Sequence, residues 1–256
     1  MLIILSPAKI QNFQFQDTIQ DYTLPQYVKE AEYLANILKS FSADDLRNLL
    51  KVNRDIARHT ADSYYNWSPL HTLENAKQAL LVYNGEVFHG LNAQNLSVVD
   101  MEYAQNHLRI ISGLYGVLRP LDLIQSYRLE MNTKLKNQRG NDLYSFWKED
   151  IPVTVLEAVK KSGEPEALLN LASNEYSKSV TLKSLGVRVI DFDFLEGRDD
   201  GYKPITIYTK KARGLMARYV IKNRIENVED LKGFDLEGYW FNSGLSSQNK
   251  LVFTRG

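Results

Sequence analysis

The chain has 256 residues, of which 44% are hydrophobic and 24% are charged, as in an ordinary soluble globular protein. Its 31 basic and 31 acidic residues cancel, so a charged partner must be sought in local clusters of charge and not in the net charge. The absence of cysteine excludes disulfides, thiolate metal ligands and a cysteine nucleophile. The opening apolar run Leu2–Leu5 is too short for a signal peptide, and no stretch is long enough to span a membrane. We therefore expect a cytoplasmic protein without membrane contact.

The first half of the sequence combines helical patterns with two strand patterns. Residues 1–6 form a continuous apolar run typical of a buried strand, and the loop Ser6-Pro7-Ala8-Lys9 follows it. A second strand is predicted over residues 79–83, ending at Asn84-Gly85. Apolar residues at helical spacing predict helices over residues 25–38, 43–50, 54–66 and 100–111.

The second half is richer in strand patterns. Strands are predicted over residues 168–172, 187–192, 203–208, 239–241 and 251–254, and helices over residues 142–147, 152–161 and 209–224. Strands separated by helices predict a mixed α/β (α+β) fold, in which helices cover a mixed sheet. We expect one domain over residues 1–256, with a possible weak boundary near residues 161–165.

The tetrapeptide Gly113-Leu114-Tyr115-Gly116 lies between two predicted helices, the second beginning near Pro120. Two helices joined by a glycine-bounded turn are typical of a helix-hairpin-helix, whose backbone N–H groups can approach a phosphate closely. The flanking cations are Arg109 and Arg119. An ordinary helical corner, in which Gly113 caps a helix and the arginines are solvated, is the alternative interpretation.

A second basic segment runs from residue 201 to residue 225 and contains no acid. Its helical part combines an apolar stripe with cations along both flanks, so it can pack on a core and still present positive charge. The alternatives are a solvated helix face and a polyanion site. The basic residues of this segment are Lys203, Lys210, Lys211, Arg213, Arg218, Lys222 and Arg224.

Several strings in one order along the chain resemble the YaaA family of bacterial peroxide-stress-response proteins. The strings are residues 2–9 (LIILSPAK), 84–87 (NGEV), 107–109 (HLR), 113–122 (GLYGVLRPLD), 127–131 (YRLEM), 169–176 (LNLASNEY), 210–216 (KKARGLM) and 237–239 (EGY).

The resemblance implies a cytoplasmic protein that limits iron-driven oxidative damage when hydrogen peroxide is present. It also implies a single mixed α/β domain with a helix-hairpin-helix and a positively charged cleft that binds DNA, duplex or damaged, with little sequence preference. No obligate protein partner is expected. Carried onto this sequence and joined to the basic helix, the DNA-binding residues are Lys9, Arg109, Gly113, Leu114, Tyr115, Gly116, Arg119, Lys210, Lys211, Arg213 and Arg218.

An enzyme is the alternative. Polar residues follow several predicted strands, where α/β sheets usually form a ligand crevice. Lys9, Glu86 and Glu175 would there act on a nucleotide-like or phosphorylated ligand, and Asp191 with Asp193 could hold Mg²⁺. The four histidines are widely separated and familiar catalytic motifs are missing, so we expect no metal site and no cofactor. On balance the sequence favours the DNA-binding interpretation over the enzyme.

Overall fold

The apolar run Leu2–Leu5 forms β1, the strand around which the main sheet is built. In the computed structural model, which describes residues 1–14 and 19–256, β1 pairs in parallel with β3 (Leu108–Ser112) on one side and with β6 (Ala167–Asn170) on the other. All four β1 side chains are buried, as expected for a parallel strand with both faces covered.

The main sheet is mixed. Its strand order in the described chain is β4-β3-β1-β6-β7-β10-β9, with β8 paired to β7. The five strands from β3 to β10 in this order are parallel, whereas β4, β8 and β9 are antiparallel to their neighbours. The other strands of this sheet are β4 (Gly116–Leu118), β7 (Arg188–Arg198), β8 (Gly201–Lys203), β9 (Trp240–Phe241) and β10 (Lys250–Arg255). A separate small sheet pairs β2 (Lys77–Gln78) with β5 (Leu123–Ile124).

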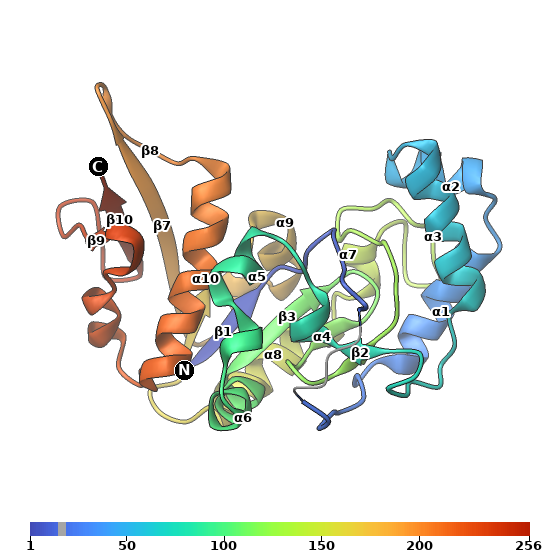
Figure 1. Cartoon of the computed structure of the whole chain (residues 1–256), viewed down its shortest axis with the longest axis horizontal. Coiled ribbons are helices and arrows are strands. Elements are labelled where there is room, and N and C mark those ends of the chain that lie inside the picture. The colour runs from blue at the N-terminus through green and yellow to red at the C-terminus, as the bar shows by residue number, and fades with distance from the viewer. Residues whose placement is uncertain (15–18) are drawn as a thin grey trace.

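Helices cover the sheet and build one end of the molecule (Figure 1). The α-helices are α1 (Val28–Lys39), α2 (Ala43–Leu50), α3 (Arg54–Asn66), α4 (Ala79–Val82), α5 (Glu86–Leu91), α6 (Val98–His107), α7 (Leu143–Phe146), α8 (Asp150–Lys161), α9 (Asn174–Ser177) and α10 (Thr206–Asn223). Short 3₁₀ helices cover Ala93–Asn95, Lys178–Val180, Leu182–Ser184, Val228–Gly233 and Leu236–Gly238. Within the described residues, none of the helices is both long and apolar enough for a membrane span.

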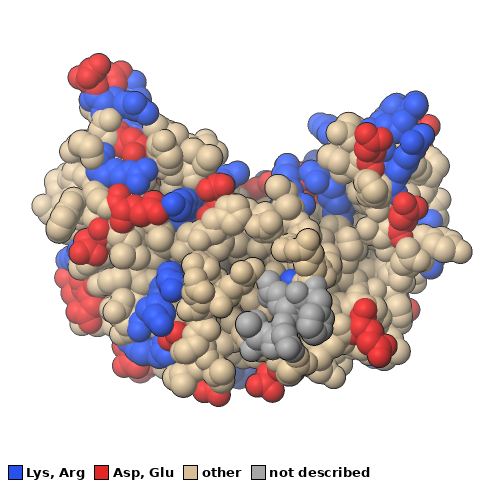
Figure 2. Space-filling view, viewed as in Figure 1, with Lys and Arg blue, Asp and Glu red and all other residues tan. Residues whose placement is uncertain are grey.

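The upper edge of the molecule is hollowed between two ends. Helices α2 and α3 form one end, and the β7–β8 hairpin projects at the other (Figure 1). The space-filling view shows the same edge as a concave surface, with lysine and arginine side chains over the α2–α3 end and along the floor, and acidic side chains among them (Figure 2). We call this edge the concave surface.

The structure confirms the mixed α/β class and forms a single domain, because β6 pairs with β1 across the weak boundary predicted near residues 161–165. Four predicted elements are wrong. Of the strand predicted over residues 203–208, only Lys203 belongs to a strand, β8, and α10 already begins at Thr206. The helix predicted over residues 100–111 ends at His107, and the buried residues after it pair with β1 as β3. Residues 79–82 form helix α4, because a short buried apolar run looks alike in a helix and in a strand. A loop and β5 follow Pro120 in place of a helix.

Candidate functional site: a buried glycine turn, a basic corner and a pocket

The glycine turn, Gly113–Gly116, joins β3 to β4 and is buried, so the helix-hairpin-helix predicted there is wrong. The side chains of Leu114 and Tyr115 are fully buried. The backbone N–H groups of both residues donate to the hydroxyl of Ser112, at 3.2 and 3.0 Å. These amides are already used within the protein and do not face a phosphate.

Close packing explains the two glycines. A Cβ on Gly113 would lie 2.3 Å from the carbonyl oxygen of Leu129. Gly116 has a φ of +68°, and a Cβ there would also meet the ring of Trp147 at 2.8 Å. Between them, the Tyr115 hydroxyl accepts hydrogen bonds from the Trp67 indole and from a backbone N–H. The tetrapeptide is therefore a packing motif of the core.

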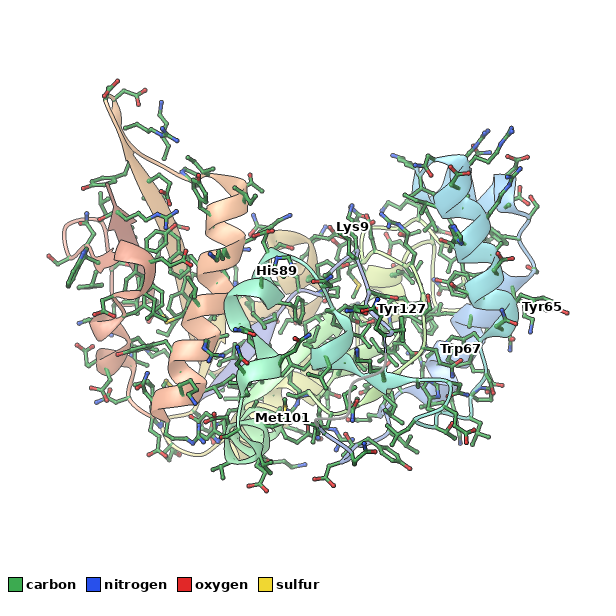
Figure 3. The ribbon with its side chains drawn as sticks, viewed as in Figure 1. Lys9, Tyr65, Trp67, His89, Met101 and Tyr127 are labelled. Carbon is green, nitrogen blue, oxygen red and sulfur yellow. The ribbon has the colours of Figure 1, made fainter. Side chains whose placement is uncertain are left out.

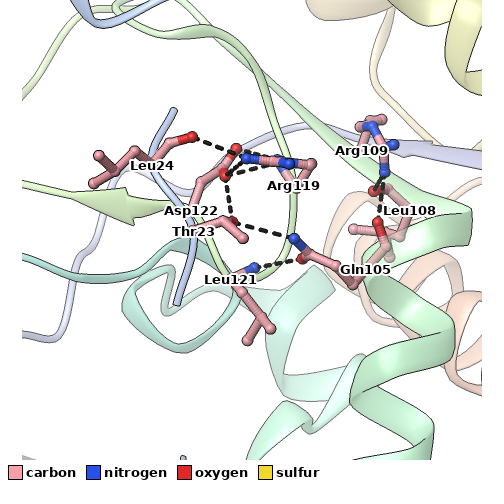
Figure 4. A network of polar contacts seen from close by, with 8 residues as sticks. All are labelled: Thr23, Leu24, Gln105, Leu108, Arg109, Arg119, Leu121 and Asp122. Atoms are coloured by element: carbon pink, nitrogen blue, oxygen red, sulfur yellow. Dashed lines mark hydrogen bonds and ion pairs between the residues drawn. The ribbon is translucent and has the colours of Figure 1, made fainter. Parts of the chain in front are cut away.

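The flanking arginines hold the protein's own groups (Figure 4). Arg109 donates to the carbonyl oxygens of Gln105 and Leu108, at 2.9 and 2.7 Å, and burial lowers its pKa to about 10. Arg119 donates to the buried carboxylate of Asp122 through Nε and Nη2, at 3.0 and 2.8 Å. Both arginines line a pocket different from the one that contains Lys9, so the single cleft predicted from these cations is not formed.

The cations of α10 divide into two groups. Lys211 forms an ion pair with Glu237 at 2.5 Å, and Arg218 donates to the carbonyl oxygens of Leu91 and Asn92, where α5 ends. Lys210 and Arg213 differ from these two, because within the described chain neither has a hydrogen-bond or ion-pair partner. The basic face of α10 is thus partly structural and partly free.

Two glycines bring α10 close to α5. A Cβ on Gly214 would lie 1.8 Å from the carbonyl oxygen of Val87, and one on Gly90 would lie 2.2 Å from that of Lys211. Only glycine permits this backbone contact. The contact holds the first half of α10 beside Glu86, the first residue of α5.

A cavity of about 590 Å³ lies between these helices and the carboxyl ends of β1 and β6. The chain leaves β1 toward β3 on one side and later places β6 on the other, so this is the topological switch point of the sheet, where ligands of α/β proteins usually bind. Lys9, which lines this switch-point pocket, lies on the concave surface (Figure 3). The charged residues of the pocket are Lys9, Glu86, Arg128, Glu130, Glu175, Lys210 and Arg213.

The pocket unites most of the residues named for the enzyme alternative. Lys9, Glu86 and Glu175 all line it, as expected. Asp191 does not line it: its carboxylate accepts a hydrogen bond from Asn170 at 2.7 Å. Asp193 pairs with Lys250, and among the described residues no group of three histidines or acids is arranged to hold a metal ion. The magnesium site considered at Asp191 and Asp193 is therefore not supported.

The acids of the pocket are held in different ways. Glu130 accepts from both Lys9 and Arg128, at 3.0 and 3.3 Å. Glu175 accepts from the backbone N–H of Asn132, and burial together with the nearby charge of Glu130 raises its pKa. The loops that follow β1 and β6 are joined by hydrogen bonds between Ser6 and Ser173. The two loops thus form a preformed wall.

A basic corner, which we define as α2, the turn Lys51-Val52-Asn53, and α3, was not predicted from the sequence. The two helices pack against each other, and Lys51 adopts the left-handed conformation with a φ of 54°. The Asn53 side chain caps α3 by accepting from the backbone N–H of Ile56 at 2.9 Å. Exposed cations without an ion-pair partner in the described chain are Lys51, Arg54 and Arg58. In the sequence, this corner shows only as a three-residue break between two amphipathic helices, and the break contains no glycine that would mark it as a turn.

The fold and the switch-point pocket define a mixed α/β domain with a ligand crevice at the carboxyl ends of its central strands. Residues 1–245 match the family described as peroxide stress protein YaaA. A UPF0246 protein of Alteromonas mediterranea is 44% identical over 255 residues, which cover 100% of this chain and 98% of that protein. The chain belongs to the YaaA family, and the resemblance seen in the sequence is confirmed.

Proposed function

We propose that this member of the peroxide stress family is a cytoplasmic protein that binds the DNA backbone across its concave surface. The contacts are made by the basic corner at one end and by the unpaired Lys210 on the floor. Such binding would serve the peroxide stress response by limiting iron-driven damage to DNA. Membership of the family supports the stress role, and the basic corner supports the DNA role.

The observation that carries the proposal is the chemistry of the basic corner. Lys51, Arg54 and Arg58 are exposed and form no ion pair within the described part of the chain. The turn between the helices also brings the N-terminus of α3 to the surface, where the helix dipole favours an anion. Free cations beside a helix N-terminus suit phosphate oxygens of any base sequence.

Two of the four acids of the corner, Asp44 and Asp45, contact neighbouring groups, whereas Asp55 and Asp62 are exposed on α3. Asp45 accepts from the hydroxyl and the backbone N–H of Ser42 in a capping box, at 2.6 and 3.0 Å. Asp44 lies 3.7 Å from Arg47. The acids and cations of the corner are equal in number, and the unpaired cations Lys51, Arg54 and Arg58 lie at the turn and in the first half of α3.

The proposal is tested by the affinity for a fluorescein-labelled duplex, measured by anisotropy over a salt series. We expect log K to fall linearly with log salt, and the variant Arg54→Gln with Arg58→Gln to lower the slope by about 2, one for each lost phosphate contact. The control is Lys160→Gln with Lys161→Gln, which removes the same charge at the C-terminal end of α8. Absence of duplex binding, or an equal change in the control, would contradict the proposal.

A further inference from the structure

The switch-point pocket contains cationic groups that the protein leaves unsatisfied. Three buried side-chain polar atoms of the described residues have no hydrogen-bond partner, and two of them are the Nε atoms of Arg128 and Arg213. Both arginines line this pocket. Because unpaired buried polar groups are rare and costly, two of them at one cavity indicate a missing anionic partner.

Arg213 is the stronger of the two cases. Arg128 donates to Glu130, but none of the guanidinium nitrogens of Arg213 donates to a described residue. Burial lowers the pKa of Arg213, and Asp193 opposes this shift only at a distance. Lys210 lies three residues earlier on α10, on the same face of the helix, and is also unpaired. An arginine fork beside a lysine is well suited to a phosphate group.

The remaining walls do not suit a bare phosphate. A cavity of about 590 Å³ is far larger than one phosphate and within the range of pockets that enclose whole small molecules. Its apolar walls include Phe88, Leu129 and Leu171, which suit a flat ring. The side chains of Asn84, Asn174 and Glu175 add amide and carboxyl groups that can pair with the polar edge of such a ring.

We infer that the switch-point pocket binds one nucleotide, with its phosphate on Arg213 and Lys210 and its base between the apolar wall and the amide and carboxyl groups. The nucleotide has two possible sources. It is either a free mononucleotide or a nucleotide extruded from DNA lying on the concave surface, which the pocket adjoins through Lys9. Only the second source rests on the proposed DNA binding.

The first arm of the test uses free ligands and the full chain. Binding of the four deoxynucleoside 5′-monophosphates is measured by calorimetry, with unphosphorylated deoxynucleosides and inorganic phosphate as matched probes. We expect the monophosphates to bind at least tenfold more tightly than either probe, and Arg213→Gln to weaken them at least tenfold. Lys160→Gln, which removes one positive charge outside the pocket, is expected to have no effect.

The second arm compares a fully paired duplex with a duplex carrying one unpaired, bulged nucleotide. If the pocket takes its nucleotide from DNA, the bulged duplex binds at least fivefold more tightly, and Arg213→Gln abolishes this preference. The empty Arg213→Gln variant is expected to melt at a higher temperature than the natural chain, because it loses an unpaired half-buried charge. Loss of binding in a more stable variant cannot result from misfolding.

Each result decides the inference. Arg213-dependent binding of mononucleotides, or an Arg213-dependent preference for the bulge, supports it and identifies the source. If inorganic phosphate binds as tightly as the monophosphates, the pocket is a simple anion site, and the inference that it binds a nucleotide is overturned. If the mononucleotides do not bind and the bulged duplex is not preferred, the inference is overturned even if the paired duplex binds. Absence of binding to any duplex overturns the proposed function alone, and the mononucleotide arm still decides the pocket.

Discussion

The glycine turn between β3 and β4 and the turn of the basic corner are both short connections, yet they have different surroundings and different purposes. The glycine turn is buried, and its amides donate to Ser112. The turn Lys51-Val52-Asn53 contains no glycine, is partly exposed and is bordered by free cations. Glycine thus marks close packing at one turn, while a lysine accepts the left-handed conformation at the other. Phosphate binding requires donors that are accessible, and the spacing of glycines in a sequence does not show whether the donors beside them are accessible.

The largest expected effect is on the glycine turn. Gly113→Ala would place a methyl group 2.3 Å from the carbonyl oxygen of Leu129, so the backbone must shift. We expect a loss of about 3 kcal/mol in the free energy of unfolding, measured with urea, and unchanged duplex affinity of the folded fraction. A loss of duplex affinity without a loss of stability would reverse the comparison.

The second effect concerns the hydroxyl at the centre of the same turn. Tyr115→Phe leaves the indole N–H of Trp67 and the backbone N–H of Gln125 without their acceptor in the core. We expect a destabilisation of roughly 2 kcal/mol, measured by thermal and urea unfolding. Unchanged stability would mean that this network does not hold the turn.

A third variant separates shape from charge in the basic corner. Lys51→Gly relieves the left-handed strain at a φ of 54°, so we expect the free energy of unfolding to rise by about 1 kcal/mol. The same change removes a phosphate contact, and duplex affinity should fall roughly threefold to tenfold. Affinity that rises with stability would show that the turn acts only through its shape.

The smallest effect is on the pH dependence of the corner. Hydrogen bonds from the Ser42 side chain and backbone lower the pKa of Asp45 in the folded chain. This carboxylate therefore stabilises the fold above its ordinary pKa, and the contribution is lost as the pH falls through the lowered value. Asp45→Asn should reduce stability slightly at pH 7 and not at pH 2, measured by urea unfolding at both values. A difference that persists at pH 2 would contradict the capping role.

Local patterns predicted much of the fold. The helices predicted over residues 43–50 and 54–66 have the same bounds in the structure, because each carries its own cap and apolar face. Prediction failed at residues 108–112, where Leu108, Ile110 and Ile111 fit a helix face and a buried strand equally well. Pairing with β1 decided between the two, and this contact joins segments about a hundred residues apart.

The site was predicted only for residues at the ends of predicted strands, because such positions can be recognised from neighbouring residues in the sequence. Lys9, Glu86 and Glu175 follow or flank predicted strands and do meet in one pocket. The wider set of DNA-binding cations stays a prediction, because sequence does not show which charges the protein itself neutralises. Arg119 is held by Asp122 and Lys211 by Glu237, whereas Lys210 and Arg213 lie on the same helix as Lys211 and are free.

The most direct test of the basic corner exploits the absence of cysteine in the chain. A single cysteine at Asn48, exposed on α2, carries an iron–EDTA probe that cleaves nearby DNA. The comparison site is Lys161→Cys, at the pocket lined by Arg109 and Arg119. The account predicts strand cleavage of bound duplex from Asn48→Cys and none from Lys161→Cys. Cleavage from position 161 alone would contradict it and would indicate that the DNA binds at the arginines that flank the glycine turn.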